Sequence, residues 1–218
     1  MKTPLLLAHR GDQNYSENTL DAFASALKKG ADGFEFDVNL NSKCEAIIVH
    51  NLIFDESFNY PSLTEVLDQF VGKCRLEMEI KAMQNGAVQK IAKIVDQYRP
   101  LDLEVTTSVQ VLCHQIAQYF PNNKRGLIFR KWLIEDWMSD KFKIEWVLNH
   151  LKLAQFNVLH LDLDLYFPEL VKVLHDNGAT LHTHLKTNSK EDFQRVLDLG
   201  IDQCTFDDIG VLKLENDL

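Results

Sequence analysis

The chain has 218 residues, 45% hydrophobic and 25% charged, so it is long enough to bury a substantial core. Its formal net charge of −9 argues against a nucleic-acid-binding protein, which normally presents a basic surface. The apolar run after Pro4 is too short for a secretion signal, and no stretch approaches the roughly 18 apolar residues of a membrane span.

Short β-like runs alternate with helical runs, as in successive βα units around a parallel sheet. The predicted strands are Leu5–His9, Gly33–Val38, Cys74–Ile80, Leu103–Ser108, Arg125–Phe129, Val158–Asp162, Thr180–Leu185 and Gln203–Phe206. The predicted helices are Thr19–Lys29, Leu63–Val71, Ala87–Tyr98, Val109–Tyr119, Lys143–Ala154, Glu169–Asp176 and Lys190–Leu199. This order predicts a (β/α)8 TIM barrel, with residues 1–218 forming a single catalytic domain.

Several helix boundaries have a local physical cause. Ser62 and Glu65 have the spacing of a capping box, in which each side chain binds a free backbone donor at the helix start. Pro168 suits a first helical position, because the missing N–H would have no partner there anyway. Gly200 follows a helical run, where a left-handed cap residue is favoured.

One segment departs from strict alternation of strands and helices. After the second strand the chain runs through Asn41–Lys43 and returns as Ala46–His50, with no room for a helix. We therefore predict a hairpin inserted after the second strand, which folds His50 back toward that strand. Residues 51–61 are predicted to form a loop over the barrel mouth.

Polar side chains fall at the carboxyl ends of several predicted strands. They are His9, Arg10, Glu35, Asp37, Glu79, Lys81 and Asp207. Barrel active sites are built at this face from residues of different strands, whereas an open doubly wound sheet would concentrate its site at one switch point. The distribution therefore favours a barrel with an active site at its carboxyl end.

Carboxylates dominate this predicted site. Glu35 and Asp37 are two residues apart in a strand and so share a face, and acids on an inner face are costly unless paired or bound to a cation. Glu79 follows on the next strand. Three carboxylates with open positions suit Mg2+ or Ca2+, although pairing with Arg10 and Lys81 alone is the alternative.

The histidines His9 and His50 flank the carboxylates. Imidazole donates or accepts a proton near neutral pH, so the pair suits acid–base catalysis; metal ligation is the other possibility. Arg10 offers paired donors that match a phosphate group. A cation, an arginine, a lysine and two histidines together indicate phosphoryl chemistry.

The order and spacing of these motifs closely resemble the glycerophosphodiester phosphodiesterase family. The matching motifs are His9-Arg10-Gly11, Glu17-Asn18-Thr19, Glu35-Phe36-Asp37, His50 and Glu79-Ile80-Lys81. Weaker similarity to the family continues as far as Asp207, so the resemblance spans essentially the whole chain. It implies a metal-dependent barrel enzyme that hydrolyses glycerophosphodiesters to glycerol 3-phosphate and an alcohol.

By this resemblance each matching residue acquires an expected role. Glu35, Asp37 and Glu79 would hold the metal, His9 and His50 would be the acid–base pair, and Arg10 and Lys81 would bind phosphate. Glu17 and Asn18 match the family too, and either contact the substrate or cap and tether the first helix. The expected partner is a small glycerophosphodiester, with no nucleic acid; the sequence leaves the oligomeric state open.

Some positions depart from the family pattern. Asn51 stands where an aspartate usually follows the histidine, and Leu185 stands where a tryptophan is common. Loss of the tryptophan removes an aromatic wall for a glycerol or a quaternary ammonium group, while Lys186 adds positive charge nearby. His182 and His184 share a face of the seventh strand, where they line the mouth or satisfy interior hydrogen bonds.

Two other functions compete with the expected one. A phospholipase D-like or C-like barrel acting on intact lipids uses a similar constellation, but no basic membrane face is evident in the sequence. A degenerate barrel that binds a phosphodiester without turnover is suggested by Asn51. The four widely spaced cysteines are expected to be reduced thiols, which together with the missing secretion signal predicts a cytoplasmic protein.

Overall fold

The structure, a computed structural model, describes residues 3–98 and 101–216. Its strands are Leu5–His9 (β1), Gly33–Leu40 (β2), Ala46–Ile48 (β3), Arg75–Ile80 (β4), Leu103–Thr107 (β5), Lys124–Ile128 (β6), Val158–His160 (β7), Thr180–Leu185 (β8) and Gln203–Phe206 (β9). Its α-helices are Leu20–Lys28 (α1), Leu63–Phe70 (α2), Ala87–Val95 (α3), Cys113–Tyr119 (α4), Asp140–Ala154 (α5), Pro168–Asp176 (α6), Lys190–Leu199 (α7) and Val211–Asn216 (α8).

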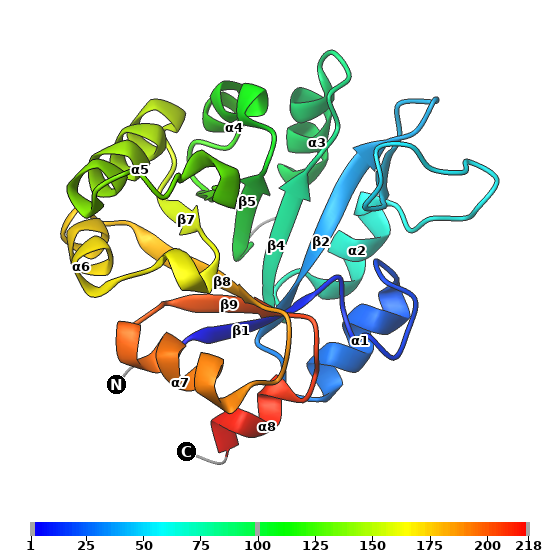
Figure 1. The fold of residues 1–218 in the computed structure, drawn as a ribbon. Coiled ribbons are helices and arrows are strands. Elements are labelled where there is room, and N and C mark those ends of the chain that lie inside the picture. The colour runs from blue at the N-terminus through cyan, green and yellow to red at the C-terminus, as the bar shows by residue number, and fades with distance from the viewer. Residues whose placement is uncertain (1–2, 99–100, 217–218) are drawn as a thin grey trace.

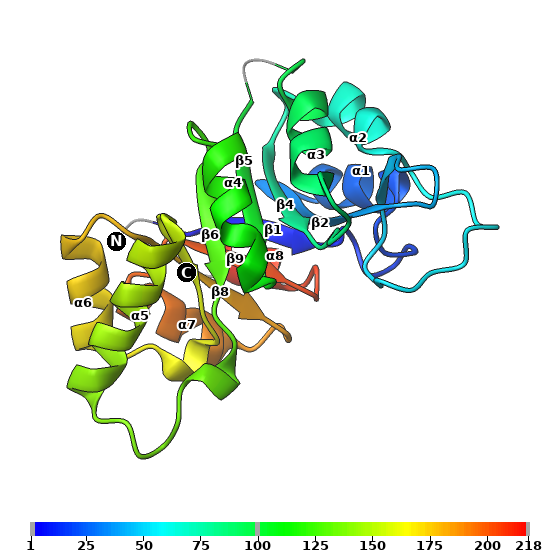
Figure 2. The same ribbon diagram turned by 90° about the horizontal axis from the view of Figure 1, so that it is seen from above.

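All strands except β3 run parallel and close into a barrel, with the helices on the outside (Figure 1 and Figure 2). Closure comes from β1, in which Leu7 lies opposite Gly33 of β2 and Thr205 of β9. A Cβ atom on Gly33 would lie only 1.9 Å from the carbonyl oxygen of Arg75, so β2 and β4 approach too closely there for any other residue. The predicted (β/α)8 barrel is confirmed.

Side chains of the barrel strands alternate between two environments. In β2, Phe34 and Phe36 point outward and are fully buried against the helices. Phe23 of α1 stacks on Phe34 with ring centroids 4.1 Å apart and an interplanar angle of 9°. The intervening residues Glu35 and Asp37 point into the barrel, so the same pleat that builds the core delivers the acids to the interior.

Local signals set several helix ends as predicted. Ser62 Oγ accepts from the Glu65 backbone N–H, and Glu65 accepts in return from the Ser62 N–H, which completes the capping box of α2. Pro168 is the first residue of α6, and Gly200 ends α7 with φ 71°. Helix α5 begins earlier than predicted, because Ser139 rather than a later residue caps it.

Three short helical segments were not predicted. They are α8, which follows the last strand, and single 3-10 turns at Lys131–Leu133 and Leu163–Leu165. These segments are too short for a clear apolar period, so no sequence pattern distinguishes them from loops. A further 3-10 turn, Gln110–Leu112, forms the start of the predicted helix Val109–Tyr119, whose α-helical part begins at Cys113.

The predicted hairpin after the second strand is confirmed. β3 pairs antiparallel with β2, with Val38 opposite Ile48. The Asn39 side chain donates to the backbone oxygen of Val49, and the Ile48 N–H donates to the oxygen of Pro61. The ends of the intervening loop are thus fixed to the barrel, while the loop itself extends outward beyond α2 in both ribbon views (Figure 1 and Figure 2).

The helices within the described ranges are short. The longest, α5, has 15 residues, and none of them is both long and apolar enough to cross a membrane. That residues 1–218 form one domain stays a prediction, since the two ends of this range lie outside the described residues.

Candidate active site

The turn after β1 sets the first group of side chains. Arg10 has a φ of 56° and Gly11 a φ of 92°, so the chain leaves the strand through two left-handed residues. A Cβ on Gly11 would lie 2.6 Å from the Ala22 side chain, which requires glycine here. The turn is fixed by the Arg10 N–H, which donates to the backbone oxygen of Glu35 at 3.0 Å. His9 and Arg10 are therefore held at the barrel mouth.

Three buried carboxylates meet at this end of the barrel. Glu35, Asp37 and Glu79 each offer an oxygen atom within 4.8 Å of the others. Burial raises the pKa of Glu35 well above its ordinary value, and the neighbouring Asp37 carboxylate raises it further. The carboxylate of Glu79 is oriented by Ser108, whose hydroxyl donates to it at 2.6 Å. The structure therefore brings together the three predicted metal ligands.

Asp37 is the most heavily contacted of the three. Lys81 Nζ lies 3.1 Å from its Oδ1, and Arg10 Nε lies 3.1 Å from its Oδ2 as an ion pair without hydrogen-bond geometry. Asn18 donates from Nδ2 to Asp37 at 2.9 Å. Burial alone would raise the pKa of Asp37. The hydrogen bond with His50 and the two nearby cations nevertheless hold this pKa below its ordinary value.

His50 is surrounded by charged groups that share its two ring nitrogens. Nδ1 lies 3.2 Å from Asp37 Oδ1 and 2.7 Å from Lys81 Nζ. Nε2 lies 3.3 Å from Arg10 Nη2. The hairpin therefore returns His50 to the carboxylates, as its sequence position predicted.

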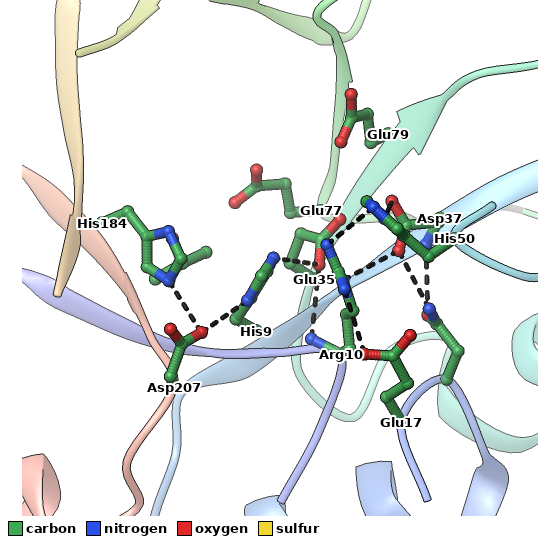
Figure 3. A network of polar contacts seen from close by, with 12 residues as sticks. His9, Arg10, Glu17, Glu35, Asp37, His50, Glu77, Glu79, His184 and Asp207 are labelled. Carbon is green, nitrogen blue, oxygen red and sulfur yellow. Dashed lines mark hydrogen bonds and ion pairs between the residues drawn. The ribbon is translucent and has the colours of Figure 1, made fainter. Parts of the chain in front are cut away.

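His9 is held by Asp207, which follows β9, the strand that pairs with β1. His9 Nδ1 donates to Asp207 Oδ1 at 2.6 Å, and His184 Nε2 of β8 donates to the same oxygen at 2.8 Å. The remaining nitrogen of His9, Nε2, faces Glu35 Oε2 at 3.8 Å (Figure 3). Burial would raise the pKa of Asp207, but the two histidine hydrogen bonds hold it below its ordinary value.

A hollow of about 390 Å3 connects these groups. Its lining includes His9, Arg10, Glu35, His50, Glu79 and Lys81. Figure 3 shows the two histidines on opposite sides of the carboxylates, with His9 toward Asp207 and His50 beside Asp37. The arrangement leaves space between them for a small phosphate-bearing molecule.

The donor set fits a hard divalent cation. All three convergent ligands are carboxylate oxygens, and their like charges in a buried position are costly without a cation. His9, His184 and Asp207 form a second group with ligand spacing, but Asp207 already accepts a short hydrogen bond from each histidine. The carboxylate group is therefore the better candidate metal site, with Mg2+ or Ca2+ as the expected ion.

A polar network fills the barrel interior below the site. Glu104 accepts from Arg75 at 2.8 Å and from Gln203 at 2.7 Å, and its other oxygen contacts His160 Nε2 at 2.6 Å. A Cβ on Gly126 would lie 2.6 Å from both Glu104 and His160, so glycine makes room for this contact. The network supports the barrel floor, since it ties together strands β4, β5, β7 and β9.

Glu77 lies between this network and the catalytic hollow. It is two residues before Glu79, points to the same interior, and is 2% exposed. Its Oε2 has no hydrogen-bond partner among the described residues: His182 Nδ1 lies 3.6 Å from it, and His160 Nδ1 lies 3.6 Å from Oε1. Burial raises the pKa of Glu77 to about 8.

Most predicted site residues converge, and two further residues join them. Asp207 had no predicted role, and His184 was expected either to line the mouth or to satisfy interior hydrogen bonds. His184 lines the mouth and binds Asp207, whereas His182 is 1% exposed and makes interior hydrogen bonds. The alternation of the two histidines in β8 was the available signal, but it does not reveal the Asp207 contact.

The fold and the site define a TIM barrel with a candidate metal centre at the carboxyl end of its strands. Residues 9–75 match the profile of the glycerophosphoryl diester phosphodiesterase family. A glycerophosphodiester phosphodiesterase of Caldanaerobacter subterraneus subsp. tengcongensis is 27% identical, with 95% of each chain covered.

Solved phosphodiesterase structures have a similar fold. A glycerophosphodiester phosphodiesterase of Thermotoga maritima superposes with a TM-score of 0.78 at 20% identity, covering 98% of both chains. An Oleispira antarctica phosphodiesterase in complex with sn-glycerol-3-phosphate gives a TM-score of 0.79 at 16% identity, covering 98% of this chain and 96% of the other. About the first third of the chain therefore resembles the glycerophosphoryl diester phosphodiesterase family in sequence, and the whole chain shares the fold of these structures.

Proposed function

We propose that the protein hydrolyses glycerophosphodiesters to glycerol 3-phosphate and an alcohol, with the help of a divalent cation. The observation that carries this proposal is the convergence of three buried carboxylates beside one hollow, which Glu35 and Glu79 line together with His9 and His50. The match of residues 9–75 to the family profile and the sn-glycerol-3-phosphate complex of the Oleispira protein support the substrate class.

Glu35, Asp37 and Glu79 would hold the cation, Mg2+ or Ca2+, which when bound would neutralise developing charge on the phosphate oxygens. Arg10 and Lys81 would bind the remaining phosphate oxygens. Both already lie beside Asp37, so they are positioned where an anion would approach the cation.

His9 is suited to accept the proton of the attacking hydroxyl, whether this belongs to water or to the substrate glycerol. Its Nδ1 donates to Asp207, so the neutral ring presents the Nε2 lone pair to the hollow. The Asp207 carboxylate then stabilises the imidazolium that forms. His50 on the other side would donate a proton to the oxygen of the departing alcohol.

The predicted substrate contacts of Glu17 and Asn18 have weaker support. Asn18 is 4% exposed, and its side chain donates to Asp37. This favours a role in which Asn18 holds the proposed metal ligand Asp37 in position over a contact with the substrate. Glu17 is exposed at the rim and pairs with Arg10 at 3.0 Å. We propose that Glu17 orients Arg10 toward the phosphate.

The competing functions have less support. Both histidines, Glu35 and Glu79 line one hollow, and Asp37 contacts His50 beside it, which disfavours a barrel without turnover. Asn51, which replaces the usual acid, is exposed, so its substitution leaves the buried catalytic groups in place. A role on intact two-chain lipids has no supporting basic surface in the sequence. The cytoplasmic location stays part of the proposal, from the sequence argument above.

The test is release of glycerol 3-phosphate from glycerophosphocholine and glycerophosphoethanolamine, followed by a coupled dehydrogenase. The wild-type protein should turn over at least one of them with a divalent cation present. His9→Ala and His50→Ala should each lose more than about 100-fold in kcat while calorimetric cation binding persists. A variant with a near-normal rate would remove that histidine from the mechanism.

A further inference from the structure

The catalytic hollow has a second wall, for which the proposed reaction gives no role. Residues 128–130, at the end of β6, and residues 160–162, at the end of β7, form this wall. In the closed strand order, β6 lies across the barrel from β1, and β7 lies across from β2. The groups proposed to bind the phosphate and its cation belong to β1, β2 and β4 or directly follow them. A group joined to the phosphate can therefore reach the second wall.

The strand register brings two charged residues of this wall side by side. Ile128 of β6 lies opposite His160 of β7, and the Phe129 N–H donates to the His160 oxygen at 2.9 Å. Arg130 and Asp162 are two residues further along these neighbouring strands, and their ψ angles of 142° and 138° keep the backbone open rather than helical. Both side chains line the hollow. We name Arg130 and Asp162 the distal pair.

The distal pair carries opposite charges, yet its two members form no ion pair with each other. Within the described part of the chain, neither side chain has an oppositely charged partner. The neighbouring Lys131 is bound instead to Asp164 at 2.5 Å, and these two residues lie outside the hollow. The guanidinium of Arg130 lies over the Trp132 ring, with its Cζ atom 5.9 Å from the ring centroid. Each charge of the distal pair is therefore available to a bound molecule.

These two charges complement a head group that is itself zwitterionic. A head group with only a positive charge would meet repulsion from Arg130, and one with only a negative charge would meet repulsion from Asp162. Serine joined through its hydroxyl carries both an ammonium and a carboxylate. The trimethylammonium of choline has no N–H to donate and favours an aromatic face. Phe129, which carries the phenyl ring of this wall, is only 2% exposed.

We propose that the distal pair binds the amino-acid head group of a glycerophosphodiester whose alcohol is serine. Arg130 binds the carboxylate through paired donors, and Asp162 accepts hydrogen bonds from the ammonium. The phosphate then lies across the hollow, beside Arg10 and Lys81. The inference rests on the proposed function, since it names the substrate class of the same site. Ethanolamine would engage Asp162 alone and choline would donate to neither residue, so serine should be preferred, then ethanolamine, then choline.

Binding of the free phosphorylated head groups measures this preference without turnover. O-phospho-L-serine, phosphoethanolamine and phosphocholine are titrated by calorimetry in the presence of the divalent cation. A hydrogen bond between charged groups in a half-open site should strengthen binding about tenfold, so phosphoserine should bind about tenfold more tightly than phosphoethanolamine. The kcat/KM values of the corresponding glycerophosphodiesters should follow the same order.

Single substitutions separate the two contacts. Arg130→Gln should bring the affinity for phosphoserine to that for phosphoethanolamine, and Asp162→Asn should bring the affinity for phosphoethanolamine to that for phosphocholine. Lys131→Gln and Asp164→Asn are the matched controls, because each removes the same charge at a neighbouring position outside the hollow. These controls should keep the wild-type affinity ratios. Each ratio is measured on one protein, so partial loss of folding does not change it.

The outcomes separate this proposal from the proposed function. If the three glycerophosphodiesters are turned over with equal kcat/KM, the distal pair proposal is wrong and the proposed function stands. If Arg130→Gln weakens sn-glycerol 3-phosphate as much as phosphoserine, the pair contacts another part of the substrate, which also overturns the proposal. The same holds if the controls change the ratios equally, since charge alone would then be responsible. Absence of any turnover, with Arg130-dependent preference for phosphoserine retained, would refute the proposed function alone.

Discussion

Asp207→Asn tests the proposed orientation of His9. The substitution keeps the size of the side chain but replaces the carboxylate that accepts from His9 Nδ1 at 2.6 Å and from His184 at 2.8 Å. Hydrogen bonds to a charged group contribute about 1.5–3 kcal/mol. Because the Asp207 side chain is 42% exposed, we take the lower part of this range, about 1.5–2 kcal/mol. The expected loss in kcat is about 10- to 30-fold.

The pH profile provides a second readout. Burial lowers the pKa of His9 below 6.5, while the hydrogen bond with Asp207 raises it in part. As the proton acceptor, His9 must be neutral, so activity is lost when pH falls through its pKa, below the ordinary histidine value. Removing the raising contribution lowers this pKa further. The pH at which kcat/KM falls on the acid side should therefore be lower in Asp207→Asn than in the wild-type protein. The maximum value of kcat/KM should also be lower in this variant.

Glycerophosphocholine turnover across pH 4–9 would measure both effects, with Asp207→Glu as the charge-retaining control. Asp207→Glu should recover part of the rate. If Asp207 had only a structural role, Asp207→Asn would reduce the folded fraction of the protein and leave the acid limb of kcat/KM at the wild-type pH. An unchanged kcat, or an acid limb that moves upward, would refute the assignment of His9 as proton acceptor.

Three further predictions concern stability. Because burial raises the pKa of Glu77 to about 8 in the folded state, the unfolded state releases its proton first as pH rises above about 4.5. The contribution of Glu77 to stability should therefore fall between about pH 4.5 and 8, and Glu77→Gln should make the loss of stability over this range smaller and gain about 1–3 kcal/mol at pH 7; equal slopes in both proteins would contradict it. Phe23→Ala should cost about 3–5 kcal/mol in urea unfolding, since Phe23 is fully buried on Phe34; a loss below about 1 kcal/mol would mean that the site collapses. Ser62→Ala should cost about 1 kcal/mol by removing the cap of α2, and Ser62→Thr, measured alongside, should retain most of it.

The barrel could be predicted because each of its strands is marked locally. In β2 and β4 the apolar residues alternate with acids, and turn or cap residues such as Gly200 and Ser62 separate the elements. Because parallel barrel strands share one carboxyl face, the positions of Glu35, Asp37 and Glu79 near their strand ends were enough to predict that they meet. The two-residue alternation of side chains and the position of each acid in its strand were therefore sufficient to predict this part of the site.

Contacts between distant segments could not be predicted in this way. Asp207 lies 198 residues from His9, and their hydrogen bond depends on the closure of β9 on β1. The link from Glu104 to Gln203 spans 99 residues and depends on the interior register. Similarly, the exposed Ile53 has no pattern of its own, and only the fold shows that it borders Lys81.

The most direct test of the central claim is the rate of glycerol 3-phosphate release from glycerophosphocholine by the wild-type protein, with Mg2+ or Ca2+ and then with excess chelator. The convergence of Glu35, Asp37 and Glu79 predicts turnover with a cation and its loss, reversible on adding the cation back, with chelator. Turnover that persists in chelator would contradict the carboxylate metal site. No turnover of any glycerophosphodiester with any divalent cation would contradict the proposed function.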